Sequence, residues 1–469
     1  MQPQDLYDVA VIGAGVVGAG IARELSKYEL KTVLIEKEHD VGCGTSKANS
    51  ALICTGFDAK PGTLEEKLVR ENSRLFREDV APALDIPFAE IGALLIARTD
   101  EEYAQVPKIL ELAKKNEVLD ARAVDAGEMY RLEPHLAPGM KGAVLVPKES
   151  IACPFTAPLA YVTQAVVNGT KLMLGTEVTG MSRDAAPGAI AIETSRGTVH
   201  ARYAVNAAGL FADKIDAMMG REDFRINPRK GEFFVYDKSA LQKVSHILLQ
   251  VPTPHTKGIL ISPTIFGNVI LGPTADDHQD VYDTSTSREG LARIERMGRL
   301  LMPSLVDDGE ITTTYAGNRS ATQFSDYQIR FHGDRSYVTV GGIRSTGLSA
   351  ALGIGRYVVD GLKDLGLVIS AKKEFKLVRM PYLGEFEGRP EPGQMVCFCE
   401  KVSRREIEES LRSVVPATSL GGVKRRTRAS MGRCQGFNCM PRIMQLVAAA
   451  RGMSVKEYYE GGARTAQGQ

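Results

Sequence analysis

The stretch YDVAVIGAGVVG, residues 7–18, joins a short apolar run to a glycine-rich turn and then to an alanine-rich segment. Its glycines, Gly13, Gly15 and Gly18, have the G-x-G-x-x-G spacing of a Rossmann unit, in which a strand, a tight turn and a helix follow one another. The first glycine permits the turn, the second lets the backbone approach a pyrophosphate, and the third lets the helix pack on the strand. The stretch therefore predicts a phosphate-binding turn at the start of a helix over residues 17–28.

A second apolar strand supports this interpretation, because a glycine turn alone is a weak signal. Residues 32–35, TVLI, form the predicted strand, and Glu36 follows directly. A carboxylate about 20 residues after the glycines is typical of a side chain that hydrogen-bonds the adenosine ribose. The two features together predict a dinucleotide site, although they do not separate FAD from NAD.

Later segments favour FAD. Residues 42–50, GCGTSKANS, are small and polar, as suits a chain that runs beside a pyrophosphate and a ribityl group. An apolar strand predicted at 204–209, and a strand, turn and helix start predicted at 338–349, would return to the same site with backbone amides facing the phosphates and flavin ring. Besides the three glycines and Glu36, the predicted cofactor contacts are Thr45, Ser46, Asn49, Ser50, Val178, Ala208, Gly209, Gly342, Gly347 and Leu348.

Four cysteines near the C-terminus predict a metal site. Cys397 and Cys399 form a tight Cys-x-Cys pair, and Cys434 and Cys439 form a Cys-x4-Cys pair. Four thiolates suit either a [2Fe–2S] cluster or a tetrahedral zinc, and disulfides are a third reading. The spacing favours the cluster, because structural zinc sites usually pair cysteines with two to four residues between them, whereas one residue separates Cys397 from Cys399.

Composition indicates an ordinary globular protein of two or three domains. The chain has 469 residues, of which 43% are hydrophobic and 25% charged, and its formal net charge is +1. Nothing in this balance favours nucleic acid, and no apolar run reaches the ~20 residues of a transmembrane helix. We expect a cytoplasmic location, free or peripheral to the membrane. The other three of the seven cysteines are expected to be free thiols: Cys43, Cys54 and Cys153.

Two resemblances follow from these motifs. The C-terminal cysteines, with the runs at 423–428 and 431–436, resemble the [2Fe–2S] module of bacterioferritin-associated ferredoxin. The whole chain is similar to FAD-dependent glycerol-3-phosphate dehydrogenases and 2-hydroxyacid oxidoreductases of the D-amino-acid oxidase superfamily, in the subgroup with this module fused. Beyond the glycine turn, the motifs that carry this similarity are the runs 45–51, 56–63, 228–232, 256–258, 271–274 and 315–319.

The resemblance implies a fold and domain boundaries. It implies an α/β Rossmann-type FAD-binding domain, an inserted α+β substrate domain on an antiparallel sheet, and a small helical [2Fe–2S] domain. The expected boundaries are an FAD part at about 1–84, 146–220 and 320–370, a substrate part at about 85–145 and 221–319, a linker at 384–394 and the cluster domain at 395–469. Within the last domain, helical spacing predicts helices at 403–413, with Ser403 as N-cap, and at 440–451.

The implied reaction is hydride transfer from a carbon that bears a hydroxyl to flavin N5. Electrons would then pass through the cluster to an external acceptor, either a flavoprotein reductase or a quinone-linked partner. We expect the substrate to be a small anion: glycerol 3-phosphate, a related polyol phosphate or a 2-hydroxyacid. The alternatives are an amino-acid or opine dehydrogenase or oxidase of the same superfamily, and a non-catalytic redox sensor.

Two arginines are predicted to hold the anion of the substrate. Arg319 and Arg344 lie in segments expected to meet at the flavin ring, and arginine suits bidentate binding of phosphate or carboxylate. Lys257 is the predicted further contact in the catalytic site. The sequence does not identify the general base, for which the candidates are His255, Tyr315 and Lys257. Where related sequences usually have histidine, this chain has Cys54 and Phe266, which indicates altered substrate contacts or proton handling.

Overall fold

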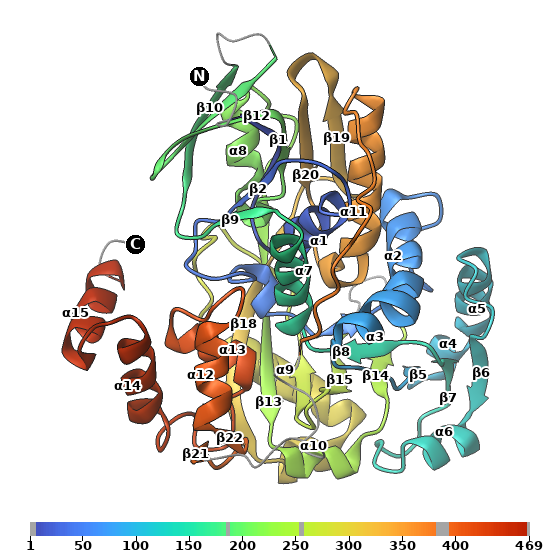
Figure 1. Cartoon of the computed structure of the whole chain (residues 1–469). Coiled ribbons are helices and arrows are strands. Elements are labelled where there is room, and N and C mark those ends of the chain that lie inside the picture. The colour runs from blue at the N-terminus through green and yellow to red at the C-terminus, as the bar shows by residue number, and fades with distance from the viewer. Residues whose placement is uncertain (1–5, 184–187, 253–257, 381–393, 467–469) are drawn as a thin grey trace. The chain divides into compact units, whose positions relative to one another are not determined.

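The computed structural model describes residues 6–183, 188–252, 258–380 and 394–466 (Figure 1). The chain divides into two compact units, Met1–Val378 and Arg379–Gln469, and each has its own buried core. The predicted linker at 384–394 lies outside the described residues except for Gln394. Of the helices that are described, none is both long enough and apolar enough to cross a bilayer.

The first unit contains a mixed sheet built around β1 (Leu6–Ile12). Parallel pairs join β1 to β2 and β12, β2 to β9, and β12 to β20, whereas β10, β11 and β19 add antiparallel pairs. The central strands are nearly continuous apolar runs because both faces of the sheet are covered. The remaining bounds are β2 (Thr32–Ile35), β9 (Lys171–Met173), β10 (Val178–Arg183), β11 (Ile190–Thr194), β12 (Gly197–Asn206), β19 (Gln328–His332) and β20 (Tyr337–Gly341).

The elements predicted around the glycine turn form, with shifted ends. The strand predicted at 32–35 is confirmed as β2, and the helix predicted at 17–28 is α1 (Val16–Leu25). The helix ends early because the backbone of Tyr28 leaves it to bridge Ala371. The strand predicted at 204–209 is the end of β12, which stops at Asn206, and Gly209 with a φ of 57° opens a short 3-10 turn instead.

Helix α1 packs directly against α11 (Gly347–Asp364) through glycine. A Cβ on Gly20 would lie 2.5 Å from the carbonyl oxygen of Ala351, and one on Gly355 would lie 2.8 Å from that of Gly20. The backbones therefore touch, and this contact brings the starts of both helices together: a Cβ on Gly347 would lie 3.6 Å from side-chain atoms of Val16. Helix α7 (Thr156–Val167) contacts α1, and α2 (Leu64–Arg74) contacts α11.

A second sheet in this unit is antiparallel at every described pair except β5–β14. Its longest pair, β13 with β18, is in register over most of both strands. The bounds are β5 (Ala93–Ala97), β6 (Arg122–Asp125), β7 (Gly142–Val146), β13 (Asn227–Tyr236), β14 (Ile247–Gln250), β15 (Leu260–Pro263), β16 (Val269–Gly272), β17 (Asp276–Asp277) and β18 (Ile311–Ala321).

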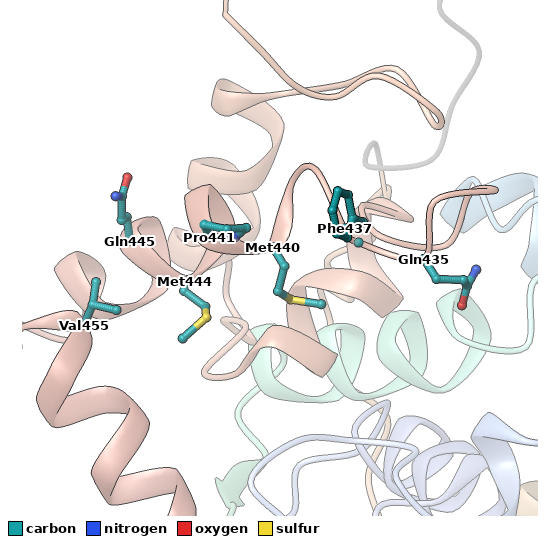
Figure 2. A pocket seen from close by; sticks show the side chains of 8 residues that line it. Gln435, Phe437, Met440, Pro441, Met444, Gln445 and Val455 are labelled. Atoms are coloured by element: carbon teal, nitrogen blue, oxygen red, sulfur yellow. The ribbon is translucent and has the colours of Figure 1, made fainter.

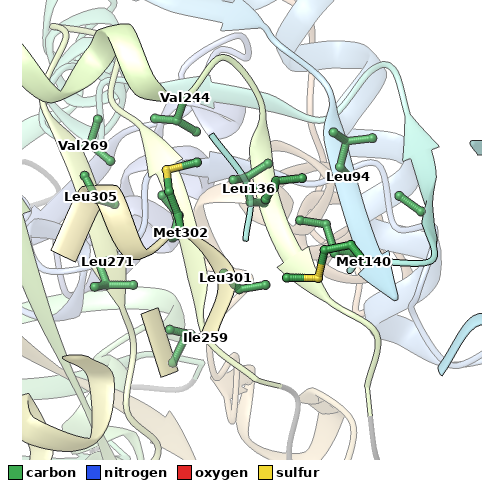
Figure 3. Packing of buried hydrophobic residues seen from close by; sticks show 14 of the residues in the cluster. Leu94, Leu136, Met140, Val244, Ile259, Val269, Leu271, Leu301, Met302 and Leu305 are labelled. Atoms are coloured by element: carbon green, nitrogen blue, oxygen red, sulfur yellow. The ribbon is translucent and has the colours of Figure 1, made fainter. Parts of the chain in front are cut away.

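One face of the second sheet is buried by helices. Leu271 of β16 and Leu94 of β5 belong to the same apolar cluster as Leu301 and Leu305, which lie in α9 (Arg288–Leu301) and α10 (Pro303–Asp308) (Figure 3). All four side chains are inaccessible to solvent. Burial of each such side chain contributes about 1.5–3 kcal/mol, so this cluster anchors the sheet.

A small third sheet contains a buried carboxylate. Strand β8 (Ser150–Ala152) pairs with β3 (Leu52–Ile53) and β4 (Phe88–Glu90). Glu149, just before β8, accepts hydrogen bonds from the backbone N–H of Thr55 at 2.7 Å and from its hydroxyl at 2.6 Å. Burial raises the pKa of Glu149 to about 7, despite these two donors.

The remaining described elements of the first unit are short. They connect the three sheets or cover their edges. Their bounds are η2 (Thr45–Lys47), η3 (Leu75–Val80), α3 (Ala81–Leu84), α4 (Asp100–Tyr103), α5 (Val106–Lys115), α6 (Ala126–Leu132), η4 (Gly209–Phe211), α8 (Ala212–Met218), η5 (Lys238–Lys243) and η6 (Gly333–Arg335).

The second unit is mainly helical. The helix predicted at 403–413 is confirmed as α12 (Arg404–Arg412), with Ser403 and Glu406 forming a reciprocal capping box, and the helix predicted at 440–451 as α14 (Met440–Ala450). Two further helices, α13 (Leu420–Thr427) and α15 (Val455–Ala466), have no counterpart among the predicted elements. The other bounds are β21 (Met395–Cys397) and β22 (Val402–Ser403).

The contact between α1 and α11 should not tolerate a methyl group. We expect Gly20→Ala to lower the free energy of unfolding by about 1–3 kcal/mol, because its Cβ meets backbone rather than a movable side chain. The melting temperature of the purified protein measures the effect. Gly127→Ala in α6 is the control, since its Cβ would meet only ends of side chains and alanine favours the helix. Equal melting temperatures for both variants would contradict the close contact.

The buried carboxyl of Glu149 should make stability depend on pH. Below about pH 4.5 the group is protonated in folded and unfolded chains alike, whereas above about pH 7 the folded protein must hold a buried charge. Stability should therefore fall as pH rises through this window, by at most about 3 kcal/mol. We expect Glu149→Gln, whose amide oxygen can still accept from Thr55, to lose this dependence in melting temperatures measured at pH 5.5 and 8. Parallel pH profiles for both proteins would show that Glu149 titrates normally.

Candidate functional site

The three glycines of the first turn have different surroundings. Gly13 has a φ of 101°, and a Cβ there would lie 2.6 Å from the carbonyl oxygen of Ala207 at the end of β12. A Cβ on Gly18 would overlap the carbonyl oxygen of Gly13. Gly15 is open instead, because its Cβ would meet only the hydroxyl of Ser46, at 3.4 Å. This turn has the shape of a cradle that a phosphate group can approach at Gly15.

Glu36 lies at the tip of β2 beside this cradle. Its carboxylate accepts the backbone N–H of Ala14 at 2.7 Å and that of Glu38 at 2.9 Å. Burial raises the pKa of Glu36, and the two backbone donors oppose that rise. The carboxylate is therefore held in a fixed position next to the turn, where a ribose hydroxyl could donate to it.

The loop after β2 connects the cradle to the second sheet. The hydroxyl of Ser46 accepts the backbone N–H of Val16 at 2.9 Å, and the hydroxyl of Thr45 donates to the carbonyl of Asn318 at 2.6 Å. Tyr315 of β18 donates its hydroxyl to the carbonyl of Asn49 at 2.8 Å. Ser50, the last predicted contact of this loop, is half-buried. Thus the start of α1 and strand β18 hold opposite sides of one loop.

Several of the other predicted cofactor residues lie near the glycine turn. Ala208 contacts Gly13, and Gly347 and Leu348 begin α11 at its contact with α1. Gly342, with a φ of 64°, directly follows β20, the strand that precedes this helix. Val178 packs in the apolar cluster beneath the ends of β1 and β2. Two helix starts, each with a positive end of its dipole, therefore lie side by side among these residues.

Arg319 of β18 is a half-buried cation with backbone partners. Its guanidinium donates to the carbonyl oxygens of Arg229 at 3.4 Å and Thr274 at 3.3 Å. Within the described parts of the chain it forms no ion pair with a carboxylate. Burial and the nearby Arg229 lower its pKa, but an arginine remains charged at neutral pH. Gly231 makes room for it, since a Cβ there would lie 2.8 Å from the guanidinium.

Arg344, by contrast, already has a carboxylate partner. Its guanidinium is ion-paired with Glu65 of α2, and Glu65 also accepts the hydroxyl of Thr346 at 2.7 Å. The Nε atom of Arg344 is buried without a hydrogen-bond partner. An isolated bridge between Ser320 and Arg344 brings the two segments of the predicted anion site together. No sequence pattern points to Glu65, because it lies far from Arg344 along the chain.

The candidates for the general base are only partly described. Lys257 and His255 lie outside the described residues. Tyr315 stacks on Phe233 with 4.7 Å between ring centroids, and burial raises its pKa, so its phenol stays protonated at neutral pH. The backbone N–H of Cys54 donates to the hydroxyl oxygen of Ser349 in α11 at 2.9 Å.

Cys54 and Phe266 occupy positions where related sequences usually have histidine. Neither residue supplies an evident general base. Burial raises the pKa of Cys54 far above its ordinary value, which keeps the thiol neutral. Phe266 is half-buried in the turn between β15 and β16. Neither side chain can take the place of a histidine in proton transfer.

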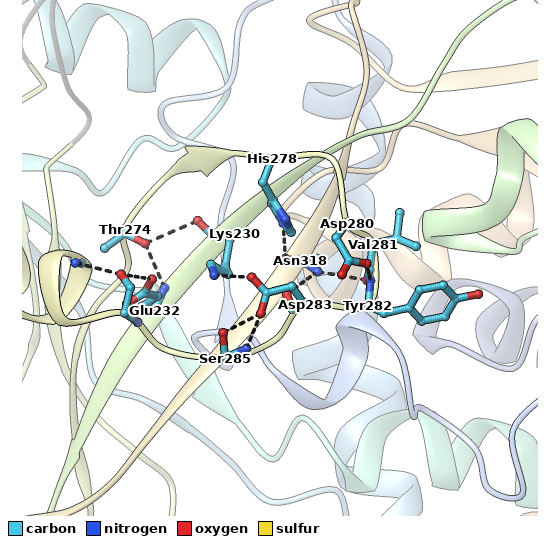
Figure 4. A network of polar contacts seen from close by, with 12 residues as sticks. Lys230, Glu232, Thr274, His278, Asp280, Val281, Tyr282, Asp283, Ser285 and Asn318 are labelled. Atoms are coloured by element: carbon cyan, nitrogen blue, oxygen red, sulfur yellow. Dashed lines mark hydrogen bonds and ion pairs between the residues drawn. The ribbon is translucent and has the colours of Figure 1, made fainter. Parts of the chain in front are cut away.

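A polar network fixes the segment that follows β17 against β13 and β18 (Figure 4). Lys230 is ion-paired with Asp283 at 2.7 Å and, with Ser285, holds the pKa of Asp283 well below its usual range. Asn318, the neighbour of Arg319, donates to the carbonyl of Asp283 at 3.0 Å and is bonded to a ring nitrogen of His278 at 2.9 Å. These contacts keep the backbone around Arg319 in place.

The four predicted metal ligands lie in two pairs in the second unit. The thiols of Cys399 and Cys434 are hydrogen-bonded to each other, as are those of Cys397 and Cys439. Backbone amides of Asn438 and two preceding residues point at the sulfur of Cys434 and lower its pKa. Among the described side chains, no group of three or more His, Cys, Asp or Glu is arranged to hold a metal ion.

This donor set fits a two-iron cluster. Each iron of a [2Fe–2S] cluster needs two thiolates, which matches two pairs, and amide hydrogen bonds to sulfur stabilise a negatively charged cluster. A cradle is also present, since a Cβ on Gly432 would overlap that of Cys399. The loop residues Ser430 and Gln435 have φ values of 71° and 48°, which no sequence pattern predicts.

Comparison with known proteins agrees with both resemblances. The FAD dependent oxidoreductase family matches residues 8–361, and the BFD-like [2Fe-2S] binding domain matches residues 395–449. A glycerol 3-phosphate dehydrogenase of Caloramator mitchellensis is 36% identical over 464 residues, which cover 96% of each chain. A glycerol 3-phosphate oxidase of Mycoplasma pneumoniae is 30% identical and covers 75% of this chain and 93% of its own.

A solved structure gives the same result. Reduced L-alpha-glycerophosphate oxidase from Mycoplasma pneumoniae with FAD bound superposes with a TM-score of 0.75 at 28% identity, covering 80% of this chain and 98% of its own. The cradle, the paired helix starts and the paired thiols fit the cofactors of these two families. The chain belongs to the FAD dependent oxidoreductase family and carries a BFD-like [2Fe-2S] domain, so it is a redox enzyme with FAD and a [2Fe–2S] cluster as its cofactors.

Proposed function

We propose that the protein is a dehydrogenase of glycerol 3-phosphate that passes electrons through its cluster to an external acceptor. The observation that carries the proposal is Arg319, a half-buried cation whose described partners are carbonyl oxygens only. Such a charge calls for an anion, and arginine matches phosphate through two parallel hydrogen bonds. The names of the similar dehydrogenase and oxidase support glycerol 3-phosphate as that anion.

The proposed FAD site follows the cradle. The turn at Gly13, Gly15 and Gly18 would hold the pyrophosphate, and Glu36 the ribose. The polar loop and both helix starts would hold the rest of the cofactor, and the second sheet would form the substrate domain. The further residues that we assign to FAD are Thr45, Ser46, Asn49, Ser50, Val178, Ala208, Gly209, Gly342, Gly347 and Leu348.

Residues of this chain would bind and orient the substrate. Arg319 holds the phosphate, and the network around Asn318 fixes its backbone. Arg344 is assigned to positioning, because Glu65 offsets its charge, and its Nε is buried without a hydrogen-bond partner. Lys257 is kept as a further substrate contact. When bound, FAD supplies the hydride acceptor, and oxidation of the alcohol releases two electrons and two protons.

The ion pair of Arg344 disfavours the alternative substrates. A 2-hydroxyacid or an amino acid has a carboxylate next to the reacting carbon, which would require a second available cation. Glu65 neutralises Arg344 and would repel such a carboxylate at this place. A polyol phosphate has only its distant phosphate to neutralise. We therefore rank glycerol 3-phosphate above hydroxyacids, amino acids and opines.

Anaerobic titration of the flavin tests the proposal directly. We expect sn-glycerol 3-phosphate to bleach the flavin absorbance of the purified enzyme, and 2-hydroxyglutarate and amino acids to leave it unchanged. Bleaching by an amino acid alone would replace the proposal with the amine-oxidising alternative. No bleaching by any of these compounds would favour a redox sensor.

The phosphate assignment predicts a change in substrate affinity. Arg319→Ala should lower kcat/KM for glycerol 3-phosphate by about 10- to 100-fold, because it removes charge-assisted hydrogen bonds of about 1.5–3 kcal/mol. The loss should appear mainly as a higher KM in steady-state assays with an artificial dye as acceptor. Arg229→Ala is the matched control, since Arg229 lies opposite Arg319 across the strand pair and is already bonded to Asp277. An equal KM in both variants would show that Arg319 does not bind the phosphate.

The ligand assignment predicts selective loss of the cluster. We assign the iron atoms to Cys397, Cys399, Cys434 and Cys439. Replacing Cys397 or Cys434 by serine should abolish the cluster signal in electron paramagnetic resonance of the reduced protein while the FAD content stays unchanged. Cys153→Ser, in the first unit, serves as control. Full iron content in both ligand variants would refute the assignment.

A further inference from the structure

Both cysteine loops expose a phenylalanine. The side chain of Phe398, between Cys397 and Cys399, is 76% exposed, and that of Phe437, between Cys434 and Cys439, is 87% exposed. Leaving such a side chain in water forgoes about 1.5–3 kcal/mol of burial. Cys399 is exposed as well. One edge of the ligand set therefore opens to solvent beside two apolar rings, and exposed apolar groups of this kind mark interaction sites.

The apolar surface continues onto the next helix. Phe437, Met440 and Met444 line a hollow of about 450 Å³, together with Val455 of α15 (Figure 2). Both methionine side chains project from the same side of α14. Methionine is flexible and polarisable, so a surface of this kind adapts to a partner without a fixed shape.

The segment that carries this surface is rich in positive charge. Residues 410–456 contain nine lysines and arginines and not one aspartate or glutamate. Some of these cations serve the fold itself: Arg426 is buried against backbone carbonyls, and Arg428 is ion-paired with Glu400. Arg433 is exposed in the second cysteine loop, and Arg442 is half-exposed on α14, bonded to Gln445. An apolar centre with a basic rim selects an acidic partner.

We propose that Phe398, Phe437 and the methionine face of α14 form the docking surface for an acidic, one-electron carrier protein. The inference rests on the proposed function, because the carrier receives the electrons of the substrate. Each substrate releases two electrons, and a [2Fe–2S] cluster held by these cysteines would carry one at a time. Two oxidised carriers would therefore be reduced in succession, and the two protons from the C–H and O–H groups would go to solvent.

The surface suits a brief encounter. Electron-transfer complexes bury less than about 1,200 Å², form quickly under electrostatic attraction and separate quickly. The phenylalanines would exclude water next to the cluster edge, and the basic rim would orient the carrier before contact. A short distance between cluster and carrier then follows from the position of both rings within the ligand loops.

Binding to two small haem proteins of opposite charge tests the proposal without turnover. The oxidised holoenzyme is titrated with oxidised cytochrome b5, which is acidic, and with cytochrome c, which is basic, by microscale thermophoresis. We expect cytochrome b5 to bind at least 10-fold more tightly, and its affinity to fall as salt is added. Equal affinity for both proteins, or tighter binding of cytochrome c, would overturn the proposal.

Two variants locate the surface. The double variant Phe398→Ser, Phe437→Ser should weaken cytochrome b5 binding by at least 10-fold while iron and FAD contents stay normal. Val414→Ser is the control, since Val414 is 50% exposed in the same unit but lies outside both cysteine loops. Unchanged binding by the double variant would overturn the proposal, and so would equal weakening by the control.

Stopped-flow mixing separates this inference from the proposed function. Glycerol 3-phosphate is first added without air, and the flavin and cluster absorbances are followed before any carrier is present. Failure at this stage would refute the substrate or the electron route, whereas the binding titrations would still decide the docking surface. If flavin and cluster are reduced but the double variant reduces cytochrome b5 as fast as the wild type, the docking surface alone is wrong.

Discussion

The contact between the backbones of α1 and α11 is the constraint on which the rest of the first unit depends. Neither Gly20 nor Gly355 has room for a Cβ, so the two helices approach more closely than ordinary side chains allow. Their starts consequently meet at Val16 and Gly347, where the positive ends of two helix dipoles lie together. A long, doubly charged cofactor such as FAD needs this concentration of positive dipole ends.

The second sheet depends on this arrangement in turn. Ser46 ties the polar loop to α1, and Tyr315 and Thr45 tie the same loop to β18. Gly317 has Gly231 opposite it across the strand pair, and neither has space for a larger residue. The absence of a side chain on Gly317 lets β18 lie against Ala48 of the polar loop, and that on Gly231 leaves room for Arg319.

The sequence predicted the parts of the structure that short-range patterns determine. The apolar runs of β1 and β2, the glycine turn and the Ser403 cap of α12 each follow from a few neighbouring residues. Glu65 could not be predicted as the partner of Arg344, because the two are 279 residues apart and only tertiary packing joins them. The same holds for Asn318, whose partners come from a loop without regular structure. Helix α13, with glycines at its start and three consecutive basic residues, lacks the apolar spacing that would have revealed it.

The domain boundaries and the roles of individual site residues stay predictions. What the geometry does add is a hierarchy among the predicted cations. The sequence predicts the same role for Arg319 and Arg344. In the structure, however, Arg319 donates to carbonyl oxygens and Arg344 is paired with a carboxylate. Electrostatic surroundings, and not residue type, separate an anion receptor from a structural ion pair.

The exposure of Cys399 has a cost for the living cell. An iron–sulfur edge that a protein carrier can reach is equally open to dissolved oxygen and peroxide, which oxidise accessible sulfur and release iron. The exposure of Cys399 therefore favours rapid electron transfer from the cluster but lowers the stability of the cluster in air.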